Sequence, residues 1–313
     1  MQTELFMYTA NAIIPVFAVI FIGIILNRLG FFTQKTKDEI VKLVFYVGTP
    51  CLIFKSTASA DFFTTFDAKF IGFTVVMILV LIAVVIAICS FIKDRAKKAA
   101  VIQIAYRSNF SIAGLPVAIS IMDEAGVGLT AVTLSFVVMV YNISAVAILS
   151  YYCGKGKGIK SMLVGMAKNP LLIASAAGLL YSLTGFAIPP VVKGTLDILG
   201  DIASSMGLLI IGATITIGGL KNDKGYIILS VLLRNLFAPL FILTAGYLAG
   251  FRGDSMLVLA VMSSTPAAVN CFAMAKQMGA DAEISAFGVS FTSIVSIFSV
   301  FASVYILKAL GIA

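Results

Sequence analysis

Residues 108–116 read SNFSIAGLP and residues 263–270 read SSTPAAVN, each in the middle of a long apolar run. Both stretches contain an asparagine and a proline. Proline removes a backbone hydrogen-bond donor and clashes with the preceding helical turn, and Gly114 loosens the first stretch further. The sequence therefore predicts that both helices are interrupted. Because a broken backbone cannot face lipid, each break is expected to line a cavity or another protein segment.

The rest of the chain is a succession of apolar runs that predicts an all-helical membrane protein. Of its 313 residues, 60% are hydrophobic and 12% are charged, whereas about a quarter of the residues of a soluble domain are charged. Seven charge-free runs are close to or above the roughly 20 residues that a spanning helix needs, and basic residues interrupt three more. The ten predicted spans are residues 5–27, 39–57, 70–92, 99–122, 125–154, 169–192, 202–220, 226–250, 255–275 and 284–307.

The two halves of the chain match each other at a constant offset. Pro15, Gly23, Gly30 and Phe31 recur 155 residues later as Pro170, Gly178, Gly185 and Phe186. We interpret residues 1–155 and 156–313 as two repeats of five spans each. Five is an odd number, so the second repeat would enter the membrane from the opposite side, an architecture typical of secondary transporters. A chance recurrence of proline and glycine, which are common in membrane helices, is the alternative.

Basic residues segregate between alternate loops and predict the orientation. Of the 22 lysines and arginines, fifteen fall in loops on one side, five on the other, and Arg107 and Arg234 within spans. The positive-inside rule places the fifteen in the cytoplasm and both termini outside a cell membrane. This topology accounts for the net charge of +8. Nucleic-acid binding, which needs a soluble basic face, is not expected from lysines in short loops.

The two breaks supply the candidate binding site. If they cross, half-helix N-termini near Pro116 and Asn270 present free amides and positive dipole ends, each worth roughly 0.3 to 2 kcal/mol to an anion. Ordinary proline kinks, repaired by neighbouring serines, are the alternative. Side chains elsewhere in the spans complete the site, although Tyr141 could instead bond across helices, as could Asn142. The predicted substrate-binding residues are Asn109, Ser111, Gly114, Pro116, Thr265, Pro266, Asn270, Thr49, Tyr141 and Arg107.

The charge inside the predicted bundle is positive. Arg107 and Arg234 lie within spans, whereas none of the 14 acids lies near a span centre. Either arginine could instead snorkel to the cytoplasmic interface. Proton coupling therefore has no obvious carrier, and sodium held by carbonyls and hydroxyls at the crossing stays open as an alternative. With no histidine and four scattered cysteines, the chain offers no ligand set for a metal or cofactor.

Three stretches carry a resemblance to a known family. Residues 43–55 (LVFYVGTPCLIFK), 109–116 and 265–270 resemble the auxin efflux carrier family, which includes plant PIN-type carriers and bacterial malonate-type permeases. The resemblance implies a five-plus-five inverted fold with crossing helices 4 and 9, similar to bile acid and sodium symporters. It also implies transport of small organic anions by an elevator-like motion, often as a homodimer. Binding roles carry over to Asn109, Pro116, Pro266 and Asn270.

Three classes of function compete on these observations. The first is a secondary carrier of small monocarboxylates or dicarboxylates, with a sodium-coupled symporter of the bile-acid type as a variant. The second is a non-transporting membrane sensor of the same fold. The third is an intramembrane enzyme, which needs a nucleophile with a base or a pair of acids and finds no candidate in the spans. We expect a carrier and no catalysis. The short loop of residues 154–168 favours a compact microbial permease over a plant-type carrier.

Overall fold

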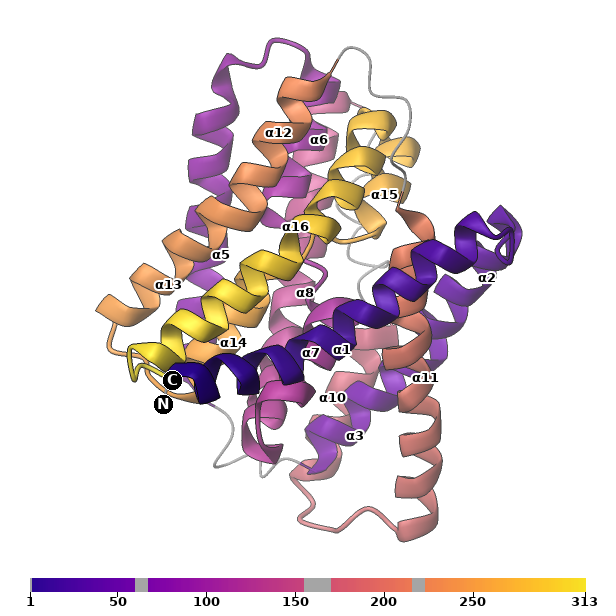
Figure 1. The fold of residues 1–313 in the computed structure, drawn as a ribbon, viewed down its shortest axis with the longest axis vertical. Helices are drawn as coiled ribbons and strands as arrows, with labels where there is room; N and C mark the ends of the chain where they lie inside the picture. The colour runs from indigo at the N-terminus through magenta and orange to yellow at the C-terminus, as the bar shows by residue number, and fades with distance from the viewer. Residues whose placement is uncertain (1, 60–66, 155–169, 216–222) are drawn as a thin grey trace.

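The chain forms a bundle of helices in a computed structural model, which describes residues 2–59, 67–154, 170–215 and 223–313 (Figure 1). Every regular element in these ranges is a helix, and strand-like pairing is confined to one isolated bridge. The all-helical prediction is confirmed for this part of the chain. The predicted boundary between the halves, at residues 155 and 156, and all of the 154–168 loop after its first residue lie outside the described residues.

Five helices in the described ranges are long and apolar enough to cross a membrane, and three shorter apolar helices accompany them. This composition is that of a multi-pass membrane protein. The long ones are α5 with the 3-10 turn η2 (Ala68–Phe91), α8 (Glu124–Cys153), α11 (Pro190–Thr214), the run α12–η4–α13 (Lys224–Leu248) and α16 (Ala282–Ala309). The shorter ones are Phe17–Arg28 within α1 (Gln2–Arg28), Phe110–Ile121 and Asp254–Ser264.

A broken helix pair lies between two long helices at two places in the chain. The first pair is α6 (Arg95–Tyr106) and the helix made of η3 (Phe110–Gly114) and α7 (Leu115–Ile121), between α5 and α8. The second pair is α14 (Asp254–Ser264) and α15 (Asn270–Met278), between the α12–η4–α13 run and α16. The other helices are α2 (Gln34–Leu43), η1 (Val44–Gly48), α3 (Thr49–Ser59) and α10 (Pro170–Ser182).

The boundary between the sixth and seventh predicted spans was wrong. Residues 169–192 were expected to form one helix, but α10 ends at Ser182 and α11 begins at Pro190, not near residue 202. Gly185 turns the chain with a φ of +68°, and its sequence match Gly30 does the same after α1 with a φ of +81°. Proline at the first position of α11 fits a helix start, because its missing amide would have no partner there.

The helices form two groups that mix both halves of the sequence. In the group we call the support group, α1 packs against α11, and α3 packs against α10 and α11 (Figure 1). In the crossover group, α6 packs against α5, α8, α12 and α16, and α16 packs against α14 and α15. The two groups meet where α1 packs against α16 and α7, where α3 and α10 pack against α8, and where α11 packs against η3. Both broken helix pairs thus belong to the crossover group.

Three turns of π-helix precede prolines. The turns η1, η3 and η4 (Leu233–Phe237) end two residues before Pro50, Pro116 and Pro239 respectively. A proline ring clashes with the carbonyl four residues earlier, and a widened turn moves that carbonyl aside. Before Pro239 the freed carbonyl is that of Asn235, and it accepts a hydrogen bond of 2.6 Å from the Ser299 hydroxyl of α16. The prolines are therefore absorbed without breaking these helices.

Two glycines let α1 and α11 approach closely. A Cβ atom on Gly23 would collide with the carbonyl of Leu209, and one on Gly212 would collide with the carbonyl of Ile20. Membrane helices commonly place small residues at such contacts. The hydrophobic effect does not drive two helices together within lipid, so their association depends on close packing. The support group therefore depends on these positions.

We expect Gly212→Leu to destabilise the protein by roughly 1 to 3 kcal/mol, since overpacking a close contact forces the helices apart. Thermal unfolding of the purified protein in detergent measures the effect. Gly194→Leu is the matched control, because Gly194 lies on the same helix and a Cβ there meets nothing within 4 Å. Equal melting temperatures for the two variants would contradict this account of the α1–α11 contact.

Candidate functional site

The two interruptions that the sequence predicts are present, and they meet. Between α6 and η3, and between α14 and α15, short extended segments pair as an antiparallel bridge at Ser108 and Ala267. The amide of Asn109 donates to the carbonyl of Pro266 at 2.7 Å, and the amide of Ala268 donates to the carbonyl of Arg107 at 3.0 Å. We call residues 107–109 and 265–269 the crossover. The two segments satisfy part of each other's backbone, and the amide of Ala267 donates to the Thr292 hydroxyl of α16. A break inside a membrane protein requires such internal partners.

The helix starts at the crossover differ in part from the prediction. The second half of the ninth predicted span begins at Asn270, as expected. The second half of the fourth begins at Phe110 and runs unbroken to Ile121, so its N-terminus is not near Pro116 as predicted. The reason is the π-turn η3, which places Pro116 inside a continuous helix. Both helices still begin next to the crossover, so the positive ends of their dipoles lie there. At the start of α15 the amides of Cys271 and Phe272 donate to the carbonyls of Ala268 and Val269.

A cavity of about 50 Å³ lies at the crossover. This volume has room for a single carboxylate group or a few water molecules. Most of its lining residues are polar or charged, and Ile112, Val138 and Val269 are its large apolar ones. Of the predicted binding residues, the cavity is lined by Arg107, Asn109, Ser111, Tyr141 and Asn270. Its remaining wall comes from Ser108, Asn142 and Ala268.

The other five predicted residues do not line this cavity. Gly114 allows the π-turn to pack, because a Cβ there would press on the ring of Phe110 and on Val261. Pro116 is buried within α7, and the hydroxyl of Thr265 lies 3.5 Å from the carbonyl of Met262. Pro266 contributes its carbonyl to the bridge. Thr49 is buried at the start of α3, in the support group.

Arg107 is a buried cation at the cavity wall. Its side chain is 5% exposed, and its Nη2 atom donates to Oδ1 of Asn142 at 2.7 Å. Its Nη1 atom lies 2.6 Å from the sulfur of Met274 on α15. The guanidinium is therefore held between α8 and α15, and the snorkelling alternative does not apply. The ion pairs found among the described residues do not include Arg107, so its charge has no counter-ion there.

Asn109 presents an unpaired donor. Its side chain is 3% exposed, and its Nδ2 atom has no hydrogen-bond partner among the described residues. A buried donor without an acceptor costs free energy, which a ligand oxygen would recover. Tyr141 and Asn142, in contrast, do bond across helices, because the Tyr141 hydroxyl donates to Ser108 Oγ at 3.5 Å and Asn142 accepts from Arg107.

Arg234 is a buried residue beside the crossover that the sequence prediction left out of the site. It lies on η4 with its side chain fully buried, and it reaches the ends of α6 and α14. Its guanidinium donates to the carbonyls of Tyr106, Met262, Ser263 and Thr265. The only signal in the sequence was a cation in an apolar run. Backbone carbonyls leave no signature in a sequence, so its partners could not be predicted.

The crossover is electrostatically asymmetric. The C-terminal ends of α6 and α14 carry the negative poles of their helix dipoles, and Arg234 neutralises both. The N-terminal ends at Phe110 and Asn270 carry positive poles and adjoin the cavity beside Arg107. The negative poles are therefore paired within the protein, whereas the positive ones are left facing the cavity. Such a cavity favours an anion.

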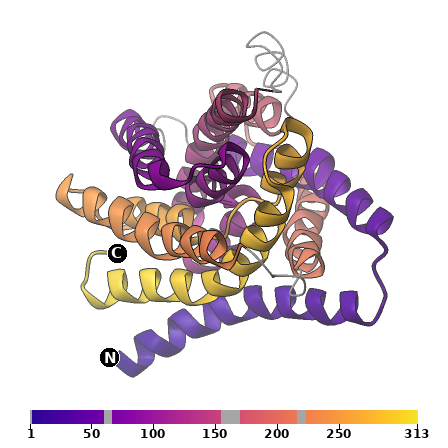
Figure 2. The ribbon, with the colours of Figure 1, turned by 90° about the horizontal axis from the view of Figure 1, so that it is seen from above.

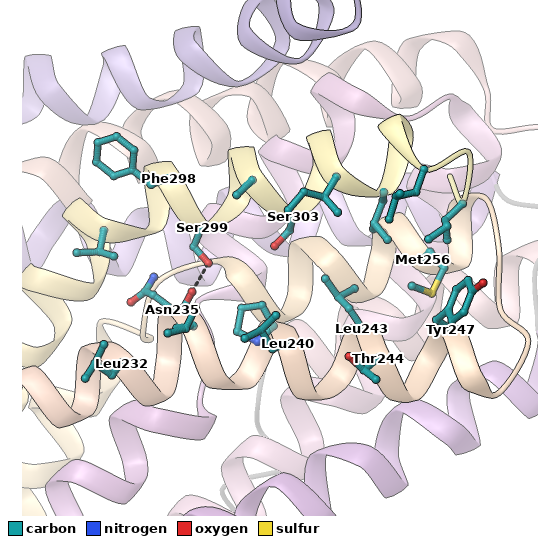
Figure 3. A pocket seen from close by; sticks show the side chains of 18 of the residues that line it. Leu232, Asn235, Leu240, Leu243, Thr244, Tyr247, Met256, Phe298, Ser299 and Ser303 are labelled. Carbon is teal, nitrogen blue, oxygen red and sulfur yellow. Dashed lines mark hydrogen bonds between the residues drawn. The ribbon is translucent and has the colours of Figure 1, made fainter. Parts of the chain in front are cut away.

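A larger hollow of about 810 Å³ lies between the α12–η4–α13 run and α16 (Figure 3). Its lining is mostly aliphatic and aromatic, and no charged side chain lines it. Leu240 and Phe298 at its edge are more than half exposed, as lipid-facing residues of a membrane protein are. The hollow offers a carboxylate no cation, so the crossover cavity is the candidate site.

Similarity to known proteins places this chain in a family. The profile of the family described as "Membrane transport protein" matches residues 8–160 and 157–305. A protein of Rhizobium meliloti named "Putative malonate transporter" is 22% identical over 307 residues, covering 95% of each chain. An "Uncharacterized transporter" of Methanothermobacter thermautotrophicus is 24% identical over 314 residues, covering 94% of this chain and 97% of that protein. With both halves of its length matched, this chain belongs to the membrane transport protein family.

Proposed function

We propose that this protein is a secondary transporter of small organic anions and that the carboxylate of its substrate binds in the crossover cavity. The observation that carries the proposal is the pairing of Arg234 with the negative helix ends, which leaves Arg107 and two positive helix ends at the cavity. A carboxylate supplies what Arg107 lacks, a counter-ion. It also supplies an acceptor for Nδ2 of Asn109.

The chemistry of the wall suits a carboxylate better than a neutral solute. Hydrogen bonds between a guanidinium and a carboxylate are roughly twice as strong as those between neutral groups. A neutral solute would leave the charge of Arg107 unpaired in a low-dielectric site, which is costly. The volume of about 50 Å³ fits a carboxylate group, so the substrate class is small monocarboxylates and dicarboxylates. The name of the Rhizobium relative agrees with a dicarboxylate.

The topology that we propose is ten spans in a five-plus-five inverted repeat. Three features support it: the order of long helix, broken pair and long helix occurs twice, Gly30 and Gly185 share a positive φ, and α1 starts at the end of the molecule where α16 finishes (Figures 1 and 2). An even number of crossings brings both termini to one side, and the loop charges favour the outside of the cell membrane.

Alternating access would follow from the two helix groups. The crossover group carries the whole cavity, and the support group packs beside it through α1 and α3. We propose an elevator-type movement in which the crossover group shifts as one body against the support group. A homodimer formed through the support group would anchor that movement.

Uptake into proteoliposomes tests the function. The purified protein is reconstituted, and accumulation of labelled malonate, malate or indole acetate is compared with that of protein-free liposomes. We expect saturable uptake of at least one carboxylate, inhibited by an unlabelled competitor. A folded preparation that carries none of these anions would contradict the proposal, and binding without flux would identify a sensor instead.

A further inference from the structure

Four backbone carbonyl oxygens at or beside the crossover converge on one side chain. They belong to Tyr106, Met262, Ser263 and Thr265, and they lie between 2.5 and 3.1 Å from the guanidinium nitrogens of Arg234. Tyr106 is the last residue of α6, and the other three lie in the last turn of α14 or just beyond it. Carbonyls at a helix C-terminus have no intrahelical donor and carry the negative pole of the dipole.

Such a cluster is a cation site by its chemistry. Unwound backbone and half-helix C-termini in membrane carriers offer carbonyl oxygens that coordinate soluble cations. Here the cation is covalently part of the protein. We infer that Arg234 is a tethered cation that fills the place of a soluble coupling ion, so that carboxylate binding at the crossover needs no sodium. This inference rests on the proposed function of the crossover cavity.

The geometry suits arginine in particular. A guanidinium has five N–H donors in a fixed plane, and the Nε, Nη1 and Nη2 atoms of Arg234 supply four hydrogen bonds to two separate helix ends. The side chain is fully buried and bonded to the chain, so ions in solution do not displace its guanidinium from the four carbonyls. Lysine, with a single nitrogen, cannot span the same set of acceptors.

Arg234 and Arg107 therefore have different roles in the proposed site. Arg107 lines the cavity and can contact a substrate. Arg234 does not line the cavity and acts on it through the helix ends that it binds. Arg234 also ties the α12–η4–α13 run to both broken helices. It is a positioning residue: it holds the negative helix ends together so that the positive ends stay aimed at the cavity.

The first arm of the test uses the wild-type protein. Malonate binding and thermal stability are measured in sodium chloride and in choline chloride. We expect the affinities for malonate in the two salts to agree within about twofold and the two melting temperatures to be equal within experimental error. The reason is that no ion from solution enters the cluster. Binding that requires sodium would overturn the inference while leaving the proposed function intact. Malate and indole acetate are measured in the same two salts. If none of the three anions binds in sodium chloride or in choline chloride, the result would instead count against the proposed function.

The second arm uses Arg234→Ala, Arg234→Lys and the control Arg252→Ala. Arg252 is an exposed arginine whose guanidinium also donates to backbone carbonyls, those of Tyr247 and Phe251. We expect Arg234→Ala to weaken malonate binding by roughly tenfold or more and to melt at a lower temperature, since two helix ends lose their partner. Millimolar guanidinium should restore both, and choline should not.

Arg234→Lys and Arg252→Ala are the comparison variants of the second arm. We expect Arg234→Lys to retain part of the binding and Arg252→Ala to behave as wild type without a response to guanidinium. Arg234→Ala with wild-type affinity and stability would overturn the inference, as would a loss that guanidinium does not reverse. If Arg234→Ala does not fold, the yield of folded protein with and without guanidinium during purification gives the same readout.

Discussion

Replacing Arg107 with methionine is expected to reduce carboxylate uptake by roughly 30-fold to several thousand-fold. Truncating one partner of a buried, hydrogen-bonded charge pair costs about 2 to 5 kcal/mol, and Arg107 is the cation at the cavity wall. Initial rates of labelled malonate uptake, at several substrate concentrations, measure the loss. Methionine keeps much of the length and the apolar stem of arginine, so the packing between α8 and α15 is largely preserved.

The stability of Arg107→Met serves as the control for its uptake. Without substrate, the buried charge of Arg107 has no counter-ion among the described residues, and burying an unpaired charge costs free energy that the methionine variant does not lose. We therefore expect Arg107→Met to melt at the wild-type temperature or above it while losing uptake. A variant that loses stability and uptake together would show that Arg107 is a structural residue, and wild-type uptake would exclude it from the site.

Replacing Asn109 with alanine is expected to reduce uptake by roughly 10-fold to 100-fold. The change removes the buried Nδ2 donor, and a hydrogen bond to a charged group contributes about 1.5 to 3 kcal/mol. Asn109→Asp has nearly the same shape but puts a negative charge at the same point, so it should reduce uptake further. We expect the same direction for Asn270→Ala, which alters the start of α15 at the cavity.

The control for the asparagine variants is Asn27→Ala. Asn27 lies at the end of α1, and its side chain accepts from Lys37 at 3.3 Å, away from the cavity lining. Its uptake should equal that of wild type under the same assay. If Asn109→Ala and Asn270→Ala both transport at the wild-type rate in folded preparations, the crossover cavity is not the substrate site.

The sequence was sufficient to predict the helical class and the position of the two breaks. Both follow from local rules, because apolar runs form helices in lipid and a proline near an asparagine disfavours a continuous one. The start of the first half-helix at Phe110 could not be predicted in the same way. A π-turn can absorb Pro116, and whether it does so depends on packing against Phe110 and Val261 that only the folded structure defines.

The partners of the two arginines show a second limit of sequence reasoning. Both were visible as charges within apolar runs, and both could have snorkelled to the interface. What distinguishes them is tertiary: Arg107 faces side chains at a cavity, and Arg234 faces backbone carbonyls from two other helices. The division at Gly185 between α10 and α11 was missed because the charge-free run of residues 169–192 covered α10, the turn and only the first residues of α11.

An experimentally determined structure of the protein saturated with malonate tests the central claim most directly. The account predicts a carboxylate in the crossover cavity, within hydrogen-bond distance of the Arg107 guanidinium and of Nδ2 of Asn109, with Arg234 still bound to the carbonyls behind it. Malonate bound elsewhere with this cavity empty, or fourth and ninth spans that run as unbroken helices, would contradict it.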